Sequence, residues 1–192
     1  SLRGFAQLAI RQIDKDPSQI DRIYRSLKVI DTQSDKLSRL ISQLLDVARI
    51  DAGRLKLERR PTDLSALVRD LTEALQPSAS RQRIIVDAPP SVVAEVDPLR
   101  IEQVLINLID NAIKYGPESG TIAIDLQQPA PGLIEIGVRD DGQGIPPEER
   151  NRIFDRFYQS RHDTLCGRRN AHPAGMGLGL YISRQITELH GG

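Results

Sequence analysis

Hydrophobic residues recur at alternating spacings of three and four along the first quarter of the chain. Between residues 20 and 48 they stand at Ile20, Ile23, Leu27, Ile30, Leu37, Ile41, Leu44 and Ala48, with one interruption at Ser34. This heptad pattern predicts a long helix with a narrow apolar face for packing against other helices. Residues 1–15 carry a similar stripe, and Asp16-Pro17 between the two stretches suits an N-cap followed by the first helical position. The pattern therefore predicts an antiparallel helical hairpin.

Two antiparallel helices bury little apolar surface alone, so a second copy would complete a four-helix bundle. We therefore expect a homodimer through residues 1–53, with Gly53 as the C-cap of the second helix. The alternative is that the long helix packs against the rest of its own chain. Residues 54–62 are charged, contain Pro61, and are interpreted as a linker.

Helical and strand patterns alternate from residue 63 onward. Helices are expected from the cap Asp63, over 98–115, from Pro146-Pro147 as a short piece, and over 178–189; strands are expected at 84–87, 92–96, 121–126 and 133–138. This order is typical of an α+β protein. For residues 63–192 we predict an α/β sandwich in which a mixed sheet packs on helices.

Composition excludes several classes of protein. The 26 basic and 26 acidic residues balance, so no broad attraction to nucleic acid or to acidic membranes is expected. The single cysteine, Cys166, excludes an internal disulfide and fits a reducing compartment. No apolar run approaches the roughly 18 residues of a membrane span. We expect a cytoplasmic region, joined to a membrane only through parts of a parent protein outside this sequence.

The predicted helix at 98–115 carries a polar stripe at Gln103, Asn107, Asn111 and Lys114, beside a broad apolar face. A polar stripe is usually the solvated side of a helix. Here it holds neutral amides rather than the Glu and Lys that a solvated side prefers. Amide oxygens suit Mg²⁺, which binds oxygen ligands and often bridges phosphates.

Asp140 follows a predicted strand and precedes Gly142 and Gly144. A carboxylate at a strand end can accept a hydrogen bond from an exocyclic amine, and glycines let a flat base approach the backbone. Adenine offers such an amine where guanine has a carbonyl, so the pattern favours ATP over GTP. The alternative is a hairpin turn, which the following Pro146-Pro147 argues against.

Two further motifs lie nearer the C-terminal end. Phe154 and Phe157 are either anchors of the core or a contact surface, and the polar stretch 158–174, with Arg161, is long enough for a lid over phosphates. The series Gly175-x-Gly177-x-Gly179 then opens the last helix. The backbone amides of such a helix start bind anions, so a triphosphate is the expected ligand.

Taken in order, the four motifs resemble the N, G1, F and G2 boxes of sensor histidine kinases, within the family that includes gyrase B, Hsp90 and MutL. The resemblance implies ATP and Mg²⁺ as cofactors, with Asn111 as metal ligand, Asn107 supporting the metal and phosphate region, and Lys114 reaching the phosphates. The implied nucleotide contacts are Asn107, Asn111, Lys114, Tyr115, Asp140, Gly142, Gly144, Arg161, Gly175, Gly177, Leu178 and Gly179. Departures from the family pattern at Gln159, Ala174 and Met176 concern lid closure and handling of the γ-phosphate.

The histidine that such kinases phosphorylate lies in a His-Glu-x-Arg/Lys-Thr-Pro-Leu context, which is absent here. The three histidines, His162, His172 and His190, have other neighbours, and the opening residues resemble the segment just after that context in the family. We therefore expect an acceptor before Ser1, and a fragment that cannot phosphorylate itself. The resemblance implies a response-regulator receiver domain as partner, which takes the phosphoryl group onto an aspartate.

Two alternatives stay open. One is a clamp-type ATPase like gyrase, Hsp90 or MutL, but those carry a glutamate base four residues before the metal-binding Asn, where this chain has Asn107. The other is a nucleotide-binding signalling module without kinase activity.

Overall fold

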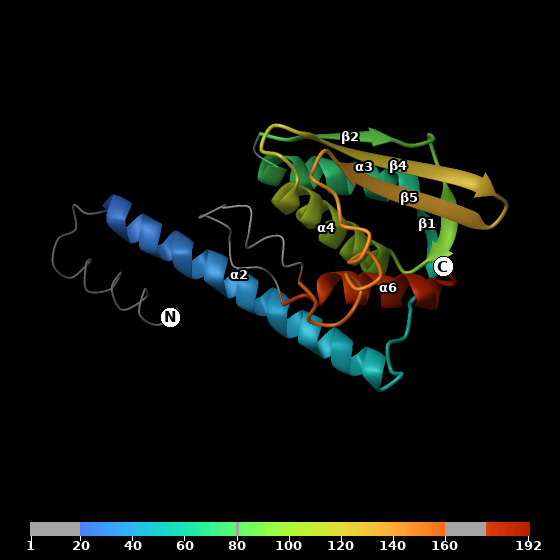
Figure 1. Ribbon diagram of the computed structural model, residues 1–192, viewed down its shortest axis with the longest axis horizontal. Coiled ribbons are helices and arrows are strands. Elements are labelled where there is room, and N and C mark those ends of the chain that lie inside the picture. The colour runs from blue at the N-terminus through green and yellow to red at the C-terminus, as the bar shows by residue number, and fades with distance from the viewer. Residues whose placement is uncertain (1–19, 80, 160–175) are drawn as a thin grey trace. The chain divides into compact units, whose positions relative to one another are not determined.

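The computed structural model describes residues 20–79, 81–159 and 176–192, and the chain divides into two compact units, residues 1–52 and 53–192 (Figure 1). The expected helix over residues 1–15 and the break at Asp16-Pro17 lie outside the described residues. The predicted hairpin is therefore seen only in its second helix.

That second helix, α2, is one continuous helix over Ile20–Asp51, uninterrupted at Ser34. It ends just before Gly53, whose φ of +62° is the left-handed conformation that terminates helices and favours glycine. Apolar side chains of its heptad pattern are exposed in the single chain: Leu27 is 52% accessible, Leu37 48% and Ile41 51%. An uncovered apolar row of this kind is the face by which helices associate.

The second unit contains two small sheets. Strand β1 (Arg60–Asp63) pairs antiparallel with β3 (Val93–Val96). Strand β4 (Thr121–Ala130) lies between β2 (Arg83–Asp87), its parallel neighbour, and β5 (Leu133–Asp140), its antiparallel neighbour. The second sheet is therefore mixed. Strand β1 begins at Arg60, within residues 54–62, which were interpreted as a linker.

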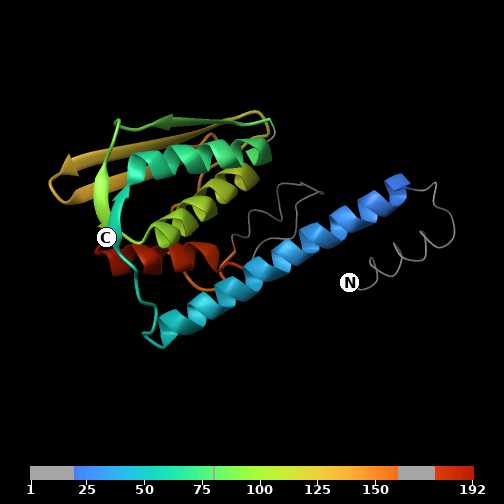
Figure 2. The same ribbon diagram turned by 180° about the vertical axis from the view of Figure 1, so that it is seen from behind.

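Helices α3 (Leu64–Leu75) and α4 (Pro98–Tyr115) lie on one face of the three-stranded sheet, and α6 (Gly179–His190) lies against α4 (Figure 1 and Figure 2). A 3₁₀ turn, η1 (Gln76–Ala79), follows α3. The inward positions of β4 meet the apolar faces of α3 and α4 in a common core that includes Val68, Leu105, Ile109, Ile122, Ile124 and Leu126. The expected mixed sheet packed on helices is confirmed.

The short helix expected after Pro146-Pro147 is absent. The Glu149 N–H donates to Pro146 O, at 2.9 Å, and the Arg152 N–H to Glu149 O, at 2.8 Å, so this stretch is a succession of turns. Two consecutive prolines fix the backbone φ angles and lack N–H donors, and here turns follow them instead of a helix.

Two aspartates begin helices by accepting from backbone N–H groups. Asp63 accepts from Ser65 and Ala66, and the Ser91 hydroxyl, which donates at 2.7 Å, is the main cause that lowers the pKa of Asp63 below its ordinary 3.8. Asp97 accepts from the Arg100 N–H at the start of α4 and, through its other oxygen, from the Glu58 N–H at 2.9 Å.

The Asp97 cap also joins α4 to α6. The backbone N–H of Asp97 donates to His190 Nε2 at 3.1 Å, while His190 Nδ1 lies 2.8 Å from Ile186 O in the preceding turn of α6. In this arrangement His190 accepts at Nε2 and donates at Nδ1. The last turn of α6 is thereby fixed to the first turn of α4, and both helices are held along their length.

Candidate nucleotide site

The middle of α4 faces α6 through Asn107. Its side-chain Nδ2 donates to the Ser183 hydroxyl oxygen at 2.9 Å. The amide also lies directly against the start of α6, because a Cβ built at Gly179 would meet the Asn107 Oδ1 and would lie 2.8 Å from its Cγ. Any side chain at position 179 would therefore require the Asn107 amide to move.

One turn further along α4, Asn111 is half-buried and makes no side-chain hydrogen bond to the described residues. An amide oxygen that no protein group occupies is available to a ligand. The described part of the chain holds no cluster of three or more His, Cys, Asp or Glu side chains. An amide oxygen such as that of Asn111 fits Mg²⁺, which takes oxygen ligands and usually keeps several waters.

At the end of α4, Lys114 and Tyr115 contact each other. Lys114 Nζ donates to the Tyr115 hydroxyl at 2.6 Å and lies 4.3 Å from the centre of its ring, a cation–π contact. Tyr115 is 42% exposed. The ammonium group is thus held on the tyrosine, and it would have to leave this contact to reach a phosphate.

Asp140 and Gly142 pack against the end of α4. Asp140 Oδ1 accepts from the Gly142 N–H at 2.7 Å, and a Cβ at Gly142 would meet that oxygen and lie 3.2 Å from the Tyr115 carbonyl. The other oxygen of Asp140 accepts no hydrogen bond from the described residues, and the residue is exposed. The turn therefore fixes the carboxylate while leaving one oxygen to a ligand.

The neighbouring Asp141 has a different role. Its Oδ2 accepts from the Thr121 N–H at 2.9 Å at the start of β4. Gly144, with a φ of +72°, lies two residues beyond Gly142 in the same loop. Asp140 therefore accepts a hydrogen bond within its own loop, whereas the adjacent Asp141 accepts one from the start of β4.

The segment containing Phe154 and Phe157 meets the glycine-rich start of α6. The Phe157 N–H donates to the Gly177 carbonyl at 3.0 Å. Gly177 has a φ of +68°, and a Cβ there would lie 2.5 Å from the Tyr158 carbonyl oxygen and 2.7 Å from the Phe157 carbonyl carbon. Phe157 is 61% exposed, and Phe154 is half-buried. Neither phenylalanine is a buried anchor of the core.

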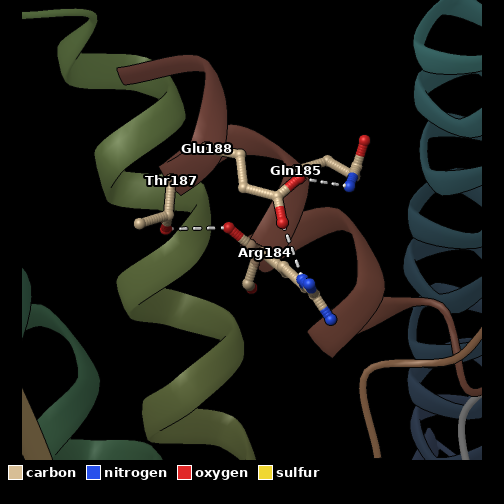
Figure 3. Close-up of polar contacts among 5 residues, drawn as sticks. Arg184, Gln185, Thr187 and Glu188 are labelled. Carbon is tan, nitrogen blue, oxygen red and sulfur yellow. Dashed lines mark hydrogen bonds and ion pairs between the residues drawn. The ribbon is translucent and has the colours of Figure 1, made fainter. Parts of the chain in front are cut away.

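An open depression of about 460 Å³ lies between that segment and α6. It is lined by Asn151, Phe154, Arg184, Thr187, Glu188 and Gly192. Glu188 accepts from Arg184 at 2.7 Å and from Gln185 at 2.8 Å (Figure 3). None of the predicted nucleotide contacts lines this depression, so it is separate from the candidate site.

Helix α6 begins after Leu178 with no side chain capping its first turn. Among the described residues, no side chain accepts from the N–H groups of this first turn, and Leu178 itself is fully buried. The predicted contacts Arg161 and Gly175 lie outside the described residues. The structure thus brings Asn107 to the glycine-rich start of α6 and the Tyr115 carbonyl to Gly142. Asn111 stands one turn beyond Asn107 on α4.

Two contributors to this arrangement were missed in the sequence. Ser183 binds Asn107 across the helix interface, and Gln82 Nε2 donates to the carbonyls of Ile113 and Pro117, at 3.2 and 2.9 Å, at the end of α4. Ser183 is a small polar residue between the buried Ile182 and Ile186, and this was a signal that could have been followed. Gln82 carries no local signal.

An α/β sandwich with an amide stripe, an aspartate-glycine loop and an uncapped glycine-rich helix start defines a class of nucleotide-binding domain. Residues 96–192 match the family described as histidine kinase-, DNA gyrase B- and HSP90-like ATPase. The chain belongs to this family, and its second unit is the ATP-binding catalytic domain of a sensor histidine kinase.

Similar proteins agree. The sensor histidine kinase TmoS of Ectopseudomonas mendocina is 36% identical over 88% of this chain and 17% of its own length. The aerobic respiration control sensor protein ArcB homolog of Haemophilus influenzae is 31% identical over 99% of this chain and 57% of its own. Full-length ShkA, crystallised in complex with AMPPNP, superposes with a TM-score of 0.70 at 25% identity, covering 99% of this chain and 38% of its own.

The chain therefore spans 17% and 57% of the length of these two curated relatives. Within the described residues, no helix combines the length and the apolar character needed to cross a membrane.

Proposed function

We propose that this chain binds Mg-ATP along α4, between the Asp140–Gly144 loop and the start of α6, and presents the γ-phosphoryl group to a histidine outside this sequence. A response-regulator aspartate then receives the phosphoryl group. The observation that supports this most is the placement of α4: one of its ends meets the aspartate-glycine loop, and its middle meets the uncapped start of α6. A base and a triphosphate need those two surroundings at the two ends of one site.

At the base end, the open oxygen of Asp140 accepts from the exocyclic amine of adenine. The Gly142 N–H holds the other oxygen, so the carboxylate is oriented before the nucleotide arrives. Gly142 and Gly144 keep the loop free of side chains, so that the flat base lies against backbone. Guanine has a carbonyl where adenine has its amine, and that carbonyl would face the carboxylate without a proton to donate.

At the phosphate end, the N–H groups of the first turn of α6 donate to phosphate oxygens, helped by the partial positive charge of the helix start. Asn111 holds Mg²⁺ through its amide oxygen. When bound there, Mg²⁺ would supply positive charge that offsets the charge developing on the phosphate oxygens during transfer. Lys114 exchanges its contact with Tyr115 for a phosphate, which frees the tyrosine ring to pack on the nucleotide.

The residue one turn before Asn111 favours transfer to a protein over hydrolysis. A clamp-type ATPase needs a carboxylate there to take a proton from water. This chain has Asn107, an amide that takes no proton and that already binds Ser183. At this position the site therefore supplies an amide that orients and not a base that activates water.

For the first unit we propose homodimerisation through residues 1–53. The exposed apolar row of α2, which includes Leu37, Ile41 and Leu44, supports this, because a second copy would cover it in a helical bundle. A dimer also brings phosphotransfer helices of two copies together as substrates for the catalytic domains.

The proposal is tested with γ-labelled ATP and Mg²⁺. The chain alone should bind ATP and acquire no label, and it should label a parent protein that carries the acceptor histidine and has its own Asn111 changed to Ala. The label should be acid-labile and base-stable, and replacing the acceptor histidine by Gln should abolish it. Release of free phosphate without any labelled protein would instead favour the clamp-type ATPase. Labelling of His162, His172 or His190 in the chain alone would contradict the proposal.

A further inference from the structure

The contact between α4 and α6 contains a part-buried polar pair, Asn107 and Ser183. Ser183 is 6% exposed, and its hydroxyl oxygen accepts from Asn107 Nδ2 at 2.9 Å. Its neighbours along the helix, Ile182 and Ile186, are buried apolar residues. A buried polar side chain in an apolar interface costs free energy unless it is paired, so such a pair fixes the two helices at one relative position.

The pair joins two matched turns. Asn107 and Asn111 are one turn apart on α4, and Gly179 and Ser183 are one turn apart on α6. The Asn107 amide lies between α4 and α6, where it is close to Gly179 and bonded to Ser183. A side chain four residues away on a helix lies on the same face, so the Asn107 contact sets where Asn111 stands relative to the start of α6.

We infer that Ser183 is a positioning residue for the magnesium-nucleotide site and that it acts through Asn107. The hydroxyl holds the Asn107 amide between the helices. The metal ligand on α4 and the phosphate-binding amides of α6 therefore keep a fixed separation before the nucleotide arrives. This inference rests on the proposed Mg-ATP site, and it assigns Asn107 to helix positioning rather than to metal ligation.

The prediction concerns magnesium dependence and not affinity alone. Ser183→Ala removes the acceptor and leaves the Asn107 amide with an unpaired donor. Affinity for a non-hydrolysable ATP analogue in Mg²⁺ should fall about tenfold, the size of one hydrogen bond. Affinity in EDTA should change by less than about twofold, because base contacts do not depend on the separation of the helices. Ser183→Thr keeps the hydroxyl and should restore the magnesium dependence.

Thr187→Val provides the matched control. Thr187 stands one turn after Ser183 on the same helix, and its hydroxyl donates to the Ser183 carbonyl oxygen, at 2.9 Å. Removing this hydroxyl should leave the affinities with and without Mg²⁺ unchanged. In an Asn107→Ala background, Ser183→Ala should have no further effect on the magnesium dependence, since its target is gone.

Calorimetric titration of the full chain and these variants, in Mg²⁺ and in EDTA, decides the matter. The inference is supported if Mg²⁺ strengthens binding by the unsubstituted chain and this strengthening is lost in Ser183→Ala. An equal loss in both buffers, or a lower melting temperature with unchanged affinities, reduces Ser183 to a structural residue and overturns it. If the unsubstituted chain shows no magnesium-dependent binding, the proposed function itself fails, and the positioning role fails with it.

Discussion

Replacing Asp140 by Asn tests the base end of the site with one atom changed. The Asp140 carboxylate is held in a turn, in which Oδ1 accepts from the Gly142 N–H at 2.7 Å. In Asp140→Asn the single remaining oxygen keeps that bond, so the new NH₂ group takes the place of the open oxygen. Two donors would then face each other, the asparagine amide and the exocyclic amine of adenine.

The size of the effect follows from that geometry. A hydrogen bond to a charged group is worth about 1.5–3 kcal/mol, which corresponds to roughly 10- to 150-fold in affinity. The fold should be unaffected, because Asp140 is exposed and the turn is kept. Affinity for GTP, which we predict to be weak, should change little, because guanine has no amine at that position.

Asp141→Asn is the matched control. It removes the same charge at the next residue, but Asp141 bonds the Thr121 N–H in the sheet and not a ligand. Competition against a labelled adenine nucleotide should show a large loss for Asp140→Asn and almost none for Asp141→Asn. Equal losses in both variants would mean that general charge, and not a bond to the base, governs affinity. Equal displacement of the label by GTP and ATP would also refute the assignment.

Three further predictions concern the helices and their caps. Leu37→Lys combined with Ile41→Lys should give monomers that still bind ATP, measured by light scattering; a monomeric parent chain would exclude the bundle. Gly179→Ala forces a methyl group into Asn107 and should lower stability by about 1–3 kcal/mol, measured by urea unfolding, whereas an unchanged midpoint would show that the helices separate freely. The pKa of Asp63 is lowered in the folded state, so the stability that its carboxylate contributes is complete above pH 3.8 and is lost as pH falls through the lower folded pKa. Asp63→Asn should therefore flatten the dependence of Tm on pH in this acid range. An unchanged dependence of Tm on pH would contradict the role of Asp63 as a cap.

Local signals predicted the elements that carry the site. Asp97-Pro98 marks the start of α4 by a capping side chain and a residue with fixed φ, and the structure confirms a helix over Pro98–Tyr115. Asp63 likewise caps α3 as expected. These signals act within one turn of helix, and a sequence displays them directly. The roles given to single residues in nucleotide binding stay predictions.

The features that were missed depend on distant partners. Strand β1 contains two charged residues and a proline, and it forms because Arg60 to Asp63 align with Val96 to Val93 of β3. Nothing local indicates that pairing. The bond between Ser183 and Asn107 joins residues 76 positions apart, and Gly179 leaves room for the Asn107 amide beside it. Contacts of this kind follow from the packing of whole elements.

The most direct test of the central claim is a calorimetric titration of the chain with a non-hydrolysable ATP analogue, in Mg²⁺ and in EDTA, for the parent and for Asn111→Ala. Asn111 is half-buried and its side chain makes no hydrogen bond to the described residues, so its replacement should leave the melting temperature nearly unchanged. We predict saturable binding by the parent that depends on Mg²⁺, and the loss of that dependence in Asn111→Ala. Equal affinities of parent and variant in Mg²⁺, or no saturable binding by a folded parent chain, would contradict the assignment of this site to Mg-ATP.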